Sequence, residues 1–406
     1  MLKDPWHFAR PELARAYLQS FELGLTSARG LFARRRMGKS EFLKHDLLPA
    51  ALHVGYAAAY TNLWDATEHP GQALASAILL ATKPRGLRRF WNDLNTPIRK
   101  LTGGGKLPLG IEGSLEVELD PDEREKMAIP AIQAALQAVD KSKKRLLLVI
   151  DEAQVLAGPE HAALAHSLRA GLDIRKAQIK VLFAGSSEAA LREMFSRAAA
   201  PFYNWAPVEP FPLLGREFVT AMVKQLSKVA KHPLKLEDAL KAYAALKETP
   251  EFFRWYIERY VMYQEQGPDQ ALAYTRARVH DDTNYAKTCK ELSRPDRGVL
   301  FLAARGVQDL YGAAALDQLR ELLSSKDAGT NAIRASIRRL TGPKLQLMAR
   351  VDHGAYRFED PEFQAWVTAR RTVDCAGGRA HGLAGRTAWP SALRKARSAL
   401  GISRDG

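Results

Sequence analysis

Eight residues near the start of the chain have the types and the spacing that bind phosphate. Residues 33–40 read Ala-Arg-Arg-Arg-Met-Gly-Lys-Ser, in which four residues precede Gly-Lys-Ser as in a phosphate-binding loop. There, backbone N–H groups and the next helix N-terminus cradle the phosphates, Lys39 reaches the β and γ oxygens, and Ser40 coordinates Mg²⁺. We therefore expect ATP and Mg²⁺ to be bound by Arg35, Arg36, Met37, Gly38, Lys39 and Ser40.

Ala33 stands where this pattern usually has glycine. The position ends the preceding strand, so a methyl group there need not enter the phosphate nest. Two alternatives remain open at this point: a solvated basic loop, and an inactive scaffold in which Ala33 disables the loop. A second motif has to separate them.

Two adjacent carboxylates supply that second motif. Asp151 and Glu152 follow the apolar run 146–150, whose lack of alternation predicts a strand buried on both faces. Ligands of open α/β sheets bind at the carboxyl ends of such strands. We expect Asp151 to hold Mg²⁺ through water and Glu152 to orient and deprotonate the attacking water. A helix cap and first-turn acid is the alternative, and the order of the two motifs favours catalysis.

Two further residues are catalytic candidates, each with a structural alternative. Ser186 follows the next predicted strand, where its hydroxyl would reach the γ-phosphate or the water, or would cap a helix. Arg197, after the following helix, would reach the γ-phosphate of a neighbouring subunit if the chain oligomerises on ATP binding, or is an ordinary surface arginine.

The elements around these motifs predict an α/β fold with a parallel sheet, the P-loop NTPase core. The strands are expected at 29–33, 53–63, 145–150 and 179–184, and the helices at 68–82, 123–140 and 161–174. Residues 83–122 break this alternation and are interpreted as an insertion with a hairpin at 107–119. Seven cations, Phe90 and Trp91 in that insertion suit a nucleic-acid strand or a partner, or equally a solvated loop.

The chain is long enough for several domains. We predict an ATPase core at 1–213, a helical lid at 214–292, and a winged helix at 293–369. The winged helix is expected to have helices at 296–310, 314–323 and 331–340 and strands at 345–351 and 356–359. Residues 370–406 hold eight Lys or Arg against two Asp and are expected to be a disordered basic tail.

Composition indicates which partners to expect. The formal net charge is +15, which favours a polyanion such as DNA. No run of about 18 apolar residues and no signal peptide occurs, so we expect a soluble, cytoplasmic protein with no membrane partner.

The third helix of the predicted winged unit is the candidate nucleic-acid reader. It carries cations and no acid, and the expected contacts are Asn331, Arg334, Arg338, Arg339 and Lys344. The whole unit has eleven basic and nine acidic residues, so its net charge is small. A protein partner therefore remains the alternative to DNA.

Several of these motifs resemble one family, the AAA-like and STAND ATPases often called archaeal ATPases. The resemblance rests on residues 8–13, on Arg35 to Ser40, on Asp151-Glu152-Ala153-Gln154, on Ala184-Gly185-Ser186 and on Tyr356 to Phe363. It implies an ATP-binding core, a helical lid and a winged helix, with adenine near Phe8 and Arg10. The family's Gly-Gly-x-Pro in the lid is here Glu248-Thr249-Pro250, a departure that bears on Arg254 as a lid sensor.

These features lead to two functional hypotheses. The first is a DNA-associated ATPase that uses ATP to switch its grip on DNA. The second is a STAND-type signalling or defence switch, in which ATP binding reorganises the lid and the winged helix and the partner is a protein. DNA binding that weakens steeply with salt would separate them.

Overall fold

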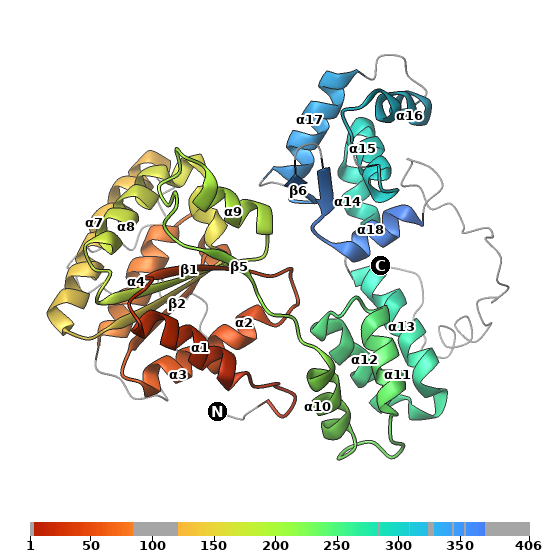
Figure 1. The fold of residues 1–406 in the computed structure, drawn as a ribbon, viewed down its shortest axis with the longest axis horizontal. Coiled ribbons are helices and arrows are strands. Elements are labelled where there is room, and N and C mark those ends of the chain that lie inside the picture. Colours follow the sequence, from red (N-terminus) through yellow and green to blue (C-terminus); the bar gives the residue numbers. More distant parts are fainter. Residues whose placement is uncertain are drawn as a thin grey trace, which may run out of the picture.

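The computed structural model describes residues 4–83, 121–282, 285–307, 309–323, 329–342, 345–352 and 355–369. A sheet with helices on both faces forms one part, a bundle of helices lies beside it, and a third part with a small hairpin lies above the bundle (Figure 1). No helix among these residues is long and apolar enough to cross a membrane.

The sheet has five parallel strands in the order β2-β3-β4-β1-β5. Its strands are β1 Ala28–Phe32, β2 Ala57–Asn62, β3 Leu146–Asp151, β4 Ile179–Gly185 and β5 Val208–Pro210. In the sheet, β4 lies between β1 and β3, and all three strands are parallel. The loop after β1 and the acids at the end of β3 therefore lie at the same edge of the sheet. This order confirms the predicted parallel core.

Helices cover both faces of the sheet, which explains why β3 is apolar from Leu146 to Ile150. Leu148 and Ile150 pack into the cluster under α4, α7 and α8, whereas Leu147 and Val149 pack into the cluster under α1 and α3. The helices of this part are α1 Pro11–Glu22, α2 Lys39–Phe42, α3 Leu48–His53, α4 Pro70–Thr82, α7 Pro121–Ser142, α8 Ala162–Asp173 and α9 Glu188–Ser196. A π-helical turn, Leu43–Leu47, joins α2 to α3, and short 3₁₀ turns follow β2 and β3.

The bundle is held together by aromatic side chains. It consists of α10 Arg216–Leu226, α11 Leu236–Ala245, α12 Pro250–Met262 and α13 Gly267–Asp282. The rings of Phe218, Tyr243 and Phe253 lie 5.2–5.9 Å apart in its centre. Trp6 and Phe8 from the N-terminal segment pack against the same cluster, so the start of the chain bridges the sheet and the bundle.

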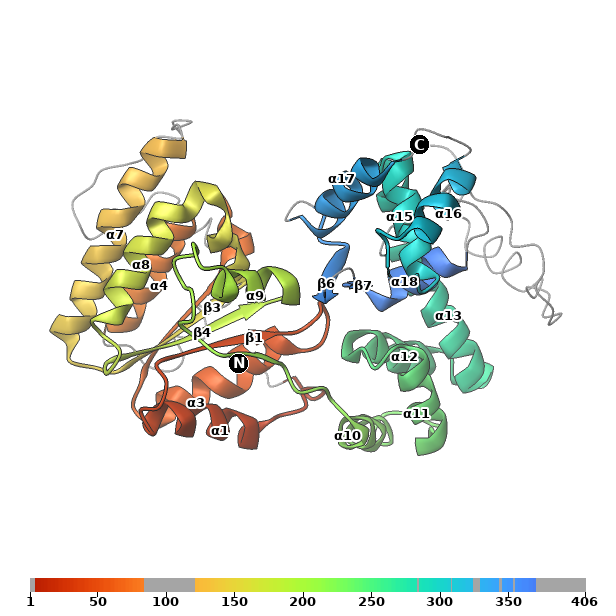
Figure 2. The same cartoon turned by 45° about the horizontal axis from the view of Figure 1, so that its top comes forward.

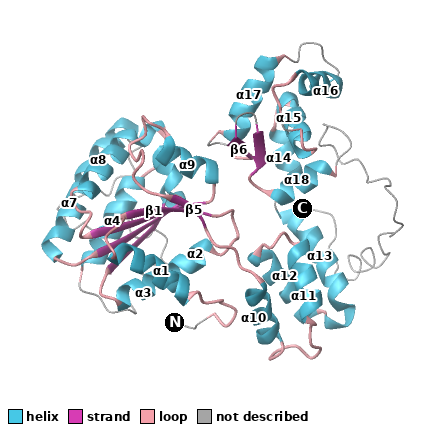
Figure 3. Cartoon of the chain, viewed as in Figure 1, coloured by secondary structure: helices cyan, strands magenta, loops and turns pink. Residues whose placement is uncertain are grey.

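The third part is a winged helix. It contains α14 Tyr285–Glu291, α15 Arg294–Ala304, α16 Ala313–Leu323, α17 Thr330–Thr341 and α18 Pro361–Thr368, with an antiparallel hairpin of β6 Met348–Asp352 and β7 Ala355–Phe358. The hairpin is the only sheet in this part among the described residues, as Figure 3 shows by its colour.

Several elements were not predicted. These are α1, the three-residue strand β5, α14 and α18. Strand β5 is short and its residues are only partly buried, so it lacks the apolar run that marks β3 and β4. Residues 84–120 of the insertion predicted at 83–122, the basic tail at 370–406 and Lys344 lie outside the described residues. The boundaries at 213 and 292 stay predictions.

Candidate nucleotide site

The loop after β1 has the backbone shape that the phosphate motif needs. Gly38 has φ +79° and precedes Lys39, the first residue of α2. An L residue with a side chain is strained in that left-handed region, so glycine suits this turn. Arg36 also adopts a left-handed conformation, with φ 68°, which coils the loop around the helix N-terminus.

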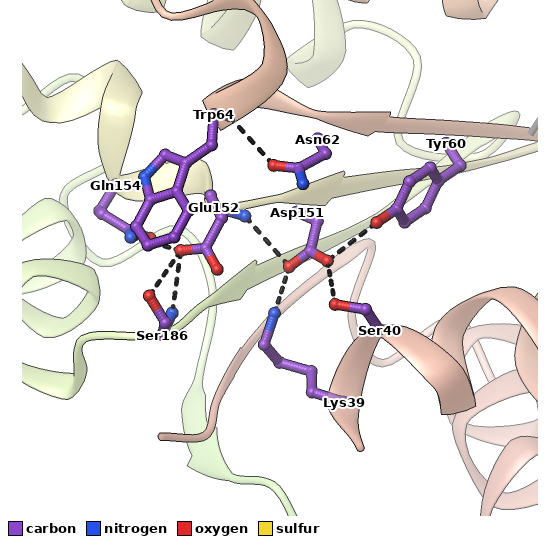
Figure 4. Close-up of polar contacts among 9 residues, drawn as sticks. All are labelled: Lys39, Ser40, Tyr60, Asn62, Trp64, Asp151, Glu152, Gln154 and Ser186. Carbon is purple, nitrogen blue, oxygen red and sulfur yellow. Dashed lines mark hydrogen bonds and ion pairs between the residues drawn. The ribbon is translucent and has the colours of Figure 1, made fainter. Parts of the chain in front are cut away.

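Asp151 is the centre of the site (Figure 4). Its Oδ1 forms an ion pair with the Lys39 ammonium and accepts the backbone N–H of Glu152 at 3.1 Å. Its Oδ2 accepts the Ser40 hydroxyl at 2.7 Å and the Tyr60 hydroxyl at 2.9 Å. Lys39 and Asp151 are 5% and 1% exposed, so the two charges meet away from water.

The electrostatics of Asp151 favour its charged form. Burial alone would raise its pKa, but the Lys39 ammonium and the hydroxyls of Ser40 and Tyr60 hold the pKa below its ordinary value. Burial and the neighbouring Asp151 carboxylate raise the pKa of Tyr60, so its hydroxyl stays a donor.

The Ser40 hydroxyl and the Asp151 carboxylate together fit Mg²⁺. They are hard oxygen donors 2.7 Å apart beside the phosphate loop. No cluster of three or more His, Cys, Asp or Glu that could hold a metal occurs in the part of the chain that the structure describes. A pair of protein oxygens suffices because Mg²⁺ normally completes its shell with phosphates and water.

Glu152 is held by its neighbours. It has φ 55°, and its Oε2 accepts three hydrogen bonds: from Gln154 Nε2 at 2.6 Å, from Ser186 Oγ at 2.7 Å and from the Ser186 backbone N–H at 3.2 Å. Ser186 follows β4, the strand beside β3, and this pairing brings it next to Glu152. In this arrangement the carboxylate is directed at Ser186 (Figure 4).

A cavity of about 930 Å³ opens from the phosphate loop toward the bundle. Its lining includes the loop from Arg34 to Ser40, both Glu152 and Ser186, Phe8 and Arg10. The Phe8 ring packs against Phe218 of α10 at 5.8 Å. Arg10 donates to the Pro212 carbonyl at 2.8 Å, so its guanidinium is partly occupied by the chain itself. The placement of adenine near Phe8 and Arg10 stays a prediction.

The loop arginines and the lid arginine have partners of their own. The Arg35 guanidinium lies over Trp64 at 4.2 Å, and Arg36 lies over Trp255 of α12 at 5.1 Å. Arg254 lines the cavity and pairs with Asp4 at 2.9 Å. Through the Arg36–Trp255 contact the lid touches the phosphate loop directly, which sequence spacing alone does not reveal.

The remaining candidates lie away from the cavity. Arg197 is exposed beside Glu193 at 3.8 Å and does not line the cavity, so a role toward a second subunit stays a prediction. On α17, Asn331, Arg334 and Arg338 are exposed. Arg339 is bound to Asp296 of α15 by a hydrogen bond of 2.7 Å, which orders it within the winged helix.

Two site residues were missed by sequence reasoning, Tyr60 and Gln154. Tyr60 lies on β2, next to β3, with Asn62 in register with Asp151. Its hydroxyl reaches Asp151 only because of that register, which one sequence does not supply. Gln154 ends the Asp-Glu-Ala-Gln motif of the family resemblance, which predicts no role for it. An amide two residues after Glu152 could still have been predicted to bind that carboxylate.

Comparisons with known proteins support this architecture. The structure is similar to the Walker-type ATPase PABY2304 of Pyrococcus abyssi, with a TM-score of 0.57 and 17% identity, covering 89% of this chain and 96% of that chain. It is also similar to the ORC2 protein of Aeropyrum pernix in its ADPNP–ADP complexes, with a TM-score of 0.53 and 17% identity, covering 88% and 90%. No protein-family model and no curated protein matches the sequence. The chain therefore has the fold of the AAA-like P-loop ATPases, with a helical lid and a winged helix.

Proposed function

We propose that this chain binds ATP with Mg²⁺, hydrolyses it, and uses the nucleotide state to change how its winged helix holds DNA. The observation that carries the proposal is the convergence of Lys39, Ser40 and Asp151, with Glu152 and Ser186 beside them, at one edge of the sheet. The ORC2 protein that the chain resembles was solved with ADPNP and ADP, which supports a nucleotide as the ligand.

The residues divide the work of hydrolysis. Mg²⁺, when bound, would be held by Ser40 and Asp151 and would neutralise charge on the phosphates. Lys39 exchanges Asp151 for the β and γ oxygens of ATP, which stabilises the charge of the transition state. Glu152 accepts the proton of the attacking water while the water oxygen bonds to the γ phosphorus and the bond to the β–γ bridging oxygen breaks, which releases ADP.

The DNA part of the proposal depends on α17. Arg334 and Arg338 lie one turn apart on the exposed side of this helix, while Ile333, Ile337 and Leu340 are buried on the other. An exposed cationic face on the third helix of a winged unit suits phosphate and base-edge contacts in a groove. The overall formal charge of +15 would favour association with a polyanion.

The alternative is a STAND-type switch with a protein partner. The pairing of Arg339 with Asp296 favours this alternative, because it leaves one cation fewer on the side of α17 that is predicted to bind DNA. Both hypotheses require the same ATPase, so they differ only at the winged helix.

A binding assay with random duplex DNA, with and without ATP, distinguishes the two. DNA contact predicts an affinity that differs between the two nucleotide conditions and falls by roughly 10³-fold from 50 to 200 mM salt for about six phosphate contacts. Absence of DNA binding at low salt would move the proposal to the protein partner. ATP turnover of the same preparation, measured by phosphate release, tests the ATPase part separately.

A further inference from the structure

The turn after the winged hairpin contacts the ATPase core directly beside Ser186. Glu359, which follows β7, accepts the Ser187 hydroxyl at 3.1 Å, and the backbone N–H of Ala189 favours its charged form. Arg357 of β7 forms an ion pair with Glu188. Ser187 and Glu188 are the N-cap and the first residue of α9. The hairpin β6–β7 with Glu359, called the wing below, therefore contacts the start of that helix. Figure 2 shows the hairpin facing α9.

The contact is partly shielded from water. Ser187 is 5% exposed, and burial raises the pKa of the Glu359 carboxyl above its ordinary value, against the opposing effects of Ser187 and Arg357. A carboxylate that loses water in this way is favourable only while its hydrogen bonds are made. The contact should therefore be made or broken as a unit.

A short chain of bonds connects this contact to the general base. Ser186 precedes Ser187, and its hydroxyl and N–H both donate to Glu152. The Ser186 hydroxyl is also the group expected to reach the γ-phosphate. A hydroxyl has one proton to donate, so Ser186 cannot donate to Glu152 and to the γ-phosphate at once.

A second link reaches the phosphate loop. The carboxylates of Glu152 and Asp360 both oppose the lowering of the Arg35 pKa that burial causes. Asp360 follows Glu359 directly and accepts the Tyr285 hydroxyl of α14 at 2.7 Å. The turn at 359–360 therefore contacts the start of α9 through Glu359 and acts electrostatically on Arg35 of the phosphate loop through Asp360.

We propose that Glu359 is a positioning residue for ATP hydrolysis: the docked wing fixes the Ser186–Ser187 turn, and this keeps Ser186 bonded to Glu152 and the enzyme at rest. When the Ser186 hydroxyl donates to a γ-phosphate instead of Glu152, the wing loses its contact with the start of α9. Glu152 can then accept a proton from water. Because coupling is reciprocal, ATP binding and wing docking weaken each other by the same factor. The inference rests on the proposed ATPase function.

Glu359→Ala in the full chain tests the inference, with Glu321→Ala as control because Glu321 is an exposed carboxylate on α16 of the same unit. Without DNA, Glu359→Ala should raise kcat about ten- to a hundredfold, the factor expected from losing one charge-assisted hydrogen bond of the resting state. Glu321→Ala should match the wild type. A structural defect would lower kcat, so the sign of the change is diagnostic. An unchanged or lower kcat overturns the inference.

A charge exchange provides a second test that does not depend on Glu359. Arg357→Glu places two carboxylates together and should also raise kcat. Glu188 also pairs with Arg192, so the compensating variant combines Arg357→Glu with Glu188→Arg and Arg192→Glu; it restores both ion pairs and should return kcat toward the wild-type value. Failure of this compensating variant to reverse the single one overturns the inference.

Hydrogen exchange separates failure of this inference from failure of the ATPase proposal. The amides of residues 188–191 should exchange faster in Glu359→Ala than in the wild type without any nucleotide. If the wild type neither binds nor hydrolyses ATP, the ATPase proposal fails, and the positioning role falls with it even where exchange reports the contact. If the wild type hydrolyses ATP but exchange and kcat are the same in Glu359→Ala, only the positioning role fails.

Discussion

The charged groups of the nucleotide site and those of α17 lie in opposite surroundings. Lys39 and Asp151 are buried, and each is held by side chains from neighbouring elements. Arg334 and Arg338 are exposed to water. Removing one partner of a buried ion pair is strongly destabilising, because it leaves the other charge buried and unpaired, and buried charges in fixed geometry stabilise a transition state strongly. Exposed cations contribute in graded, salt-dependent steps. Substitutions should therefore be severe in the first region and moderate in the second.

The largest effect is expected for Lys39→Ala. In the proposed mechanism the Lys39 ammonium leaves Asp151 to bind the β and γ phosphates, so its loss should lower ATP affinity by at least about 10²-fold, as for a buried charged contact. Equilibrium binding of a fluorescent ATP analogue measures this. Wild-type affinity in the variant would remove the phosphate-loop assignment.

Two controls accompany that variant. Lys44→Ala removes a cation that lies over the Tyr60 ring at 4.8 Å and outside the cavity lining, so ATP binding should be retained. Because Lys39→Ala leaves Asp151 buried without its cation, thermal unfolding should be recorded as well. Ser40→Ala keeps the Lys39–Asp151 pair and should stay folded while Mg²⁺-dependent turnover falls.

A moderate effect is expected for Arg334→Ala combined with Arg338→Ala. DNA affinity should fall about tenfold at low salt, and the slope of log affinity against log salt should flatten by about 2, one unit for each phosphate contact. Basal ATP turnover should stay the same. The matched control is Lys231→Ala with Arg276→Ala, which removes equal charge from exposed positions of the helical lid. Equal losses in both pairs would mean that α17 has no special role.

The smallest effect is expected for Tyr60→Phe, which removes the hydroxyl that donates to Asp151 at 2.9 Å. Losing one hydrogen bond to the carboxylate proposed to hold Mg²⁺ should raise the Mg²⁺ concentration for half-maximal turnover about fivefold. Tyr56→Phe, directly before β2, is the matched control and should leave this requirement unchanged. If both variants behave alike, Tyr60 acts only through the stability of the strand.

How far the sequence predicts this molecule depends on the range of each interaction. Lys39 and Ser40 belong to a contiguous motif, and the apolar run at 146–150 indicates the buried strand that ends at Asp151. The P-loop core could therefore be predicted from local patterns. Tyr60 depends on strand register, and Glu359 on the docking of a distant unit, which local patterns do not encode. Strand β5 has three residues and is only partly buried, too short for a periodic signal.

The side-chain partners on the winged helix show the same limit. Arg338 and Arg339 are adjacent and alike in sequence, yet Arg339 is bound to Asp296, 43 residues earlier in the chain. A count of cations on the helix therefore overstates the charge available to DNA. Six of the seven cations of the insertion lie outside the described residues, and the insertion as a binding surface stays a prediction.

The central claim is that ATP is hydrolysed at this site with Glu152 as the base, and Glu152→Gln tests it most directly. The amide keeps the size of the side chain but cannot take a proton from water, while Lys39, Ser40 and Asp151 remain to bind ATP and Mg²⁺. Measured together on one preparation, ATP affinity should be retained and turnover should fall by about 10² to 10⁴-fold. Turnover at the wild-type rate would show that Glu152 is only an acid at the end of β3, and would contradict the account.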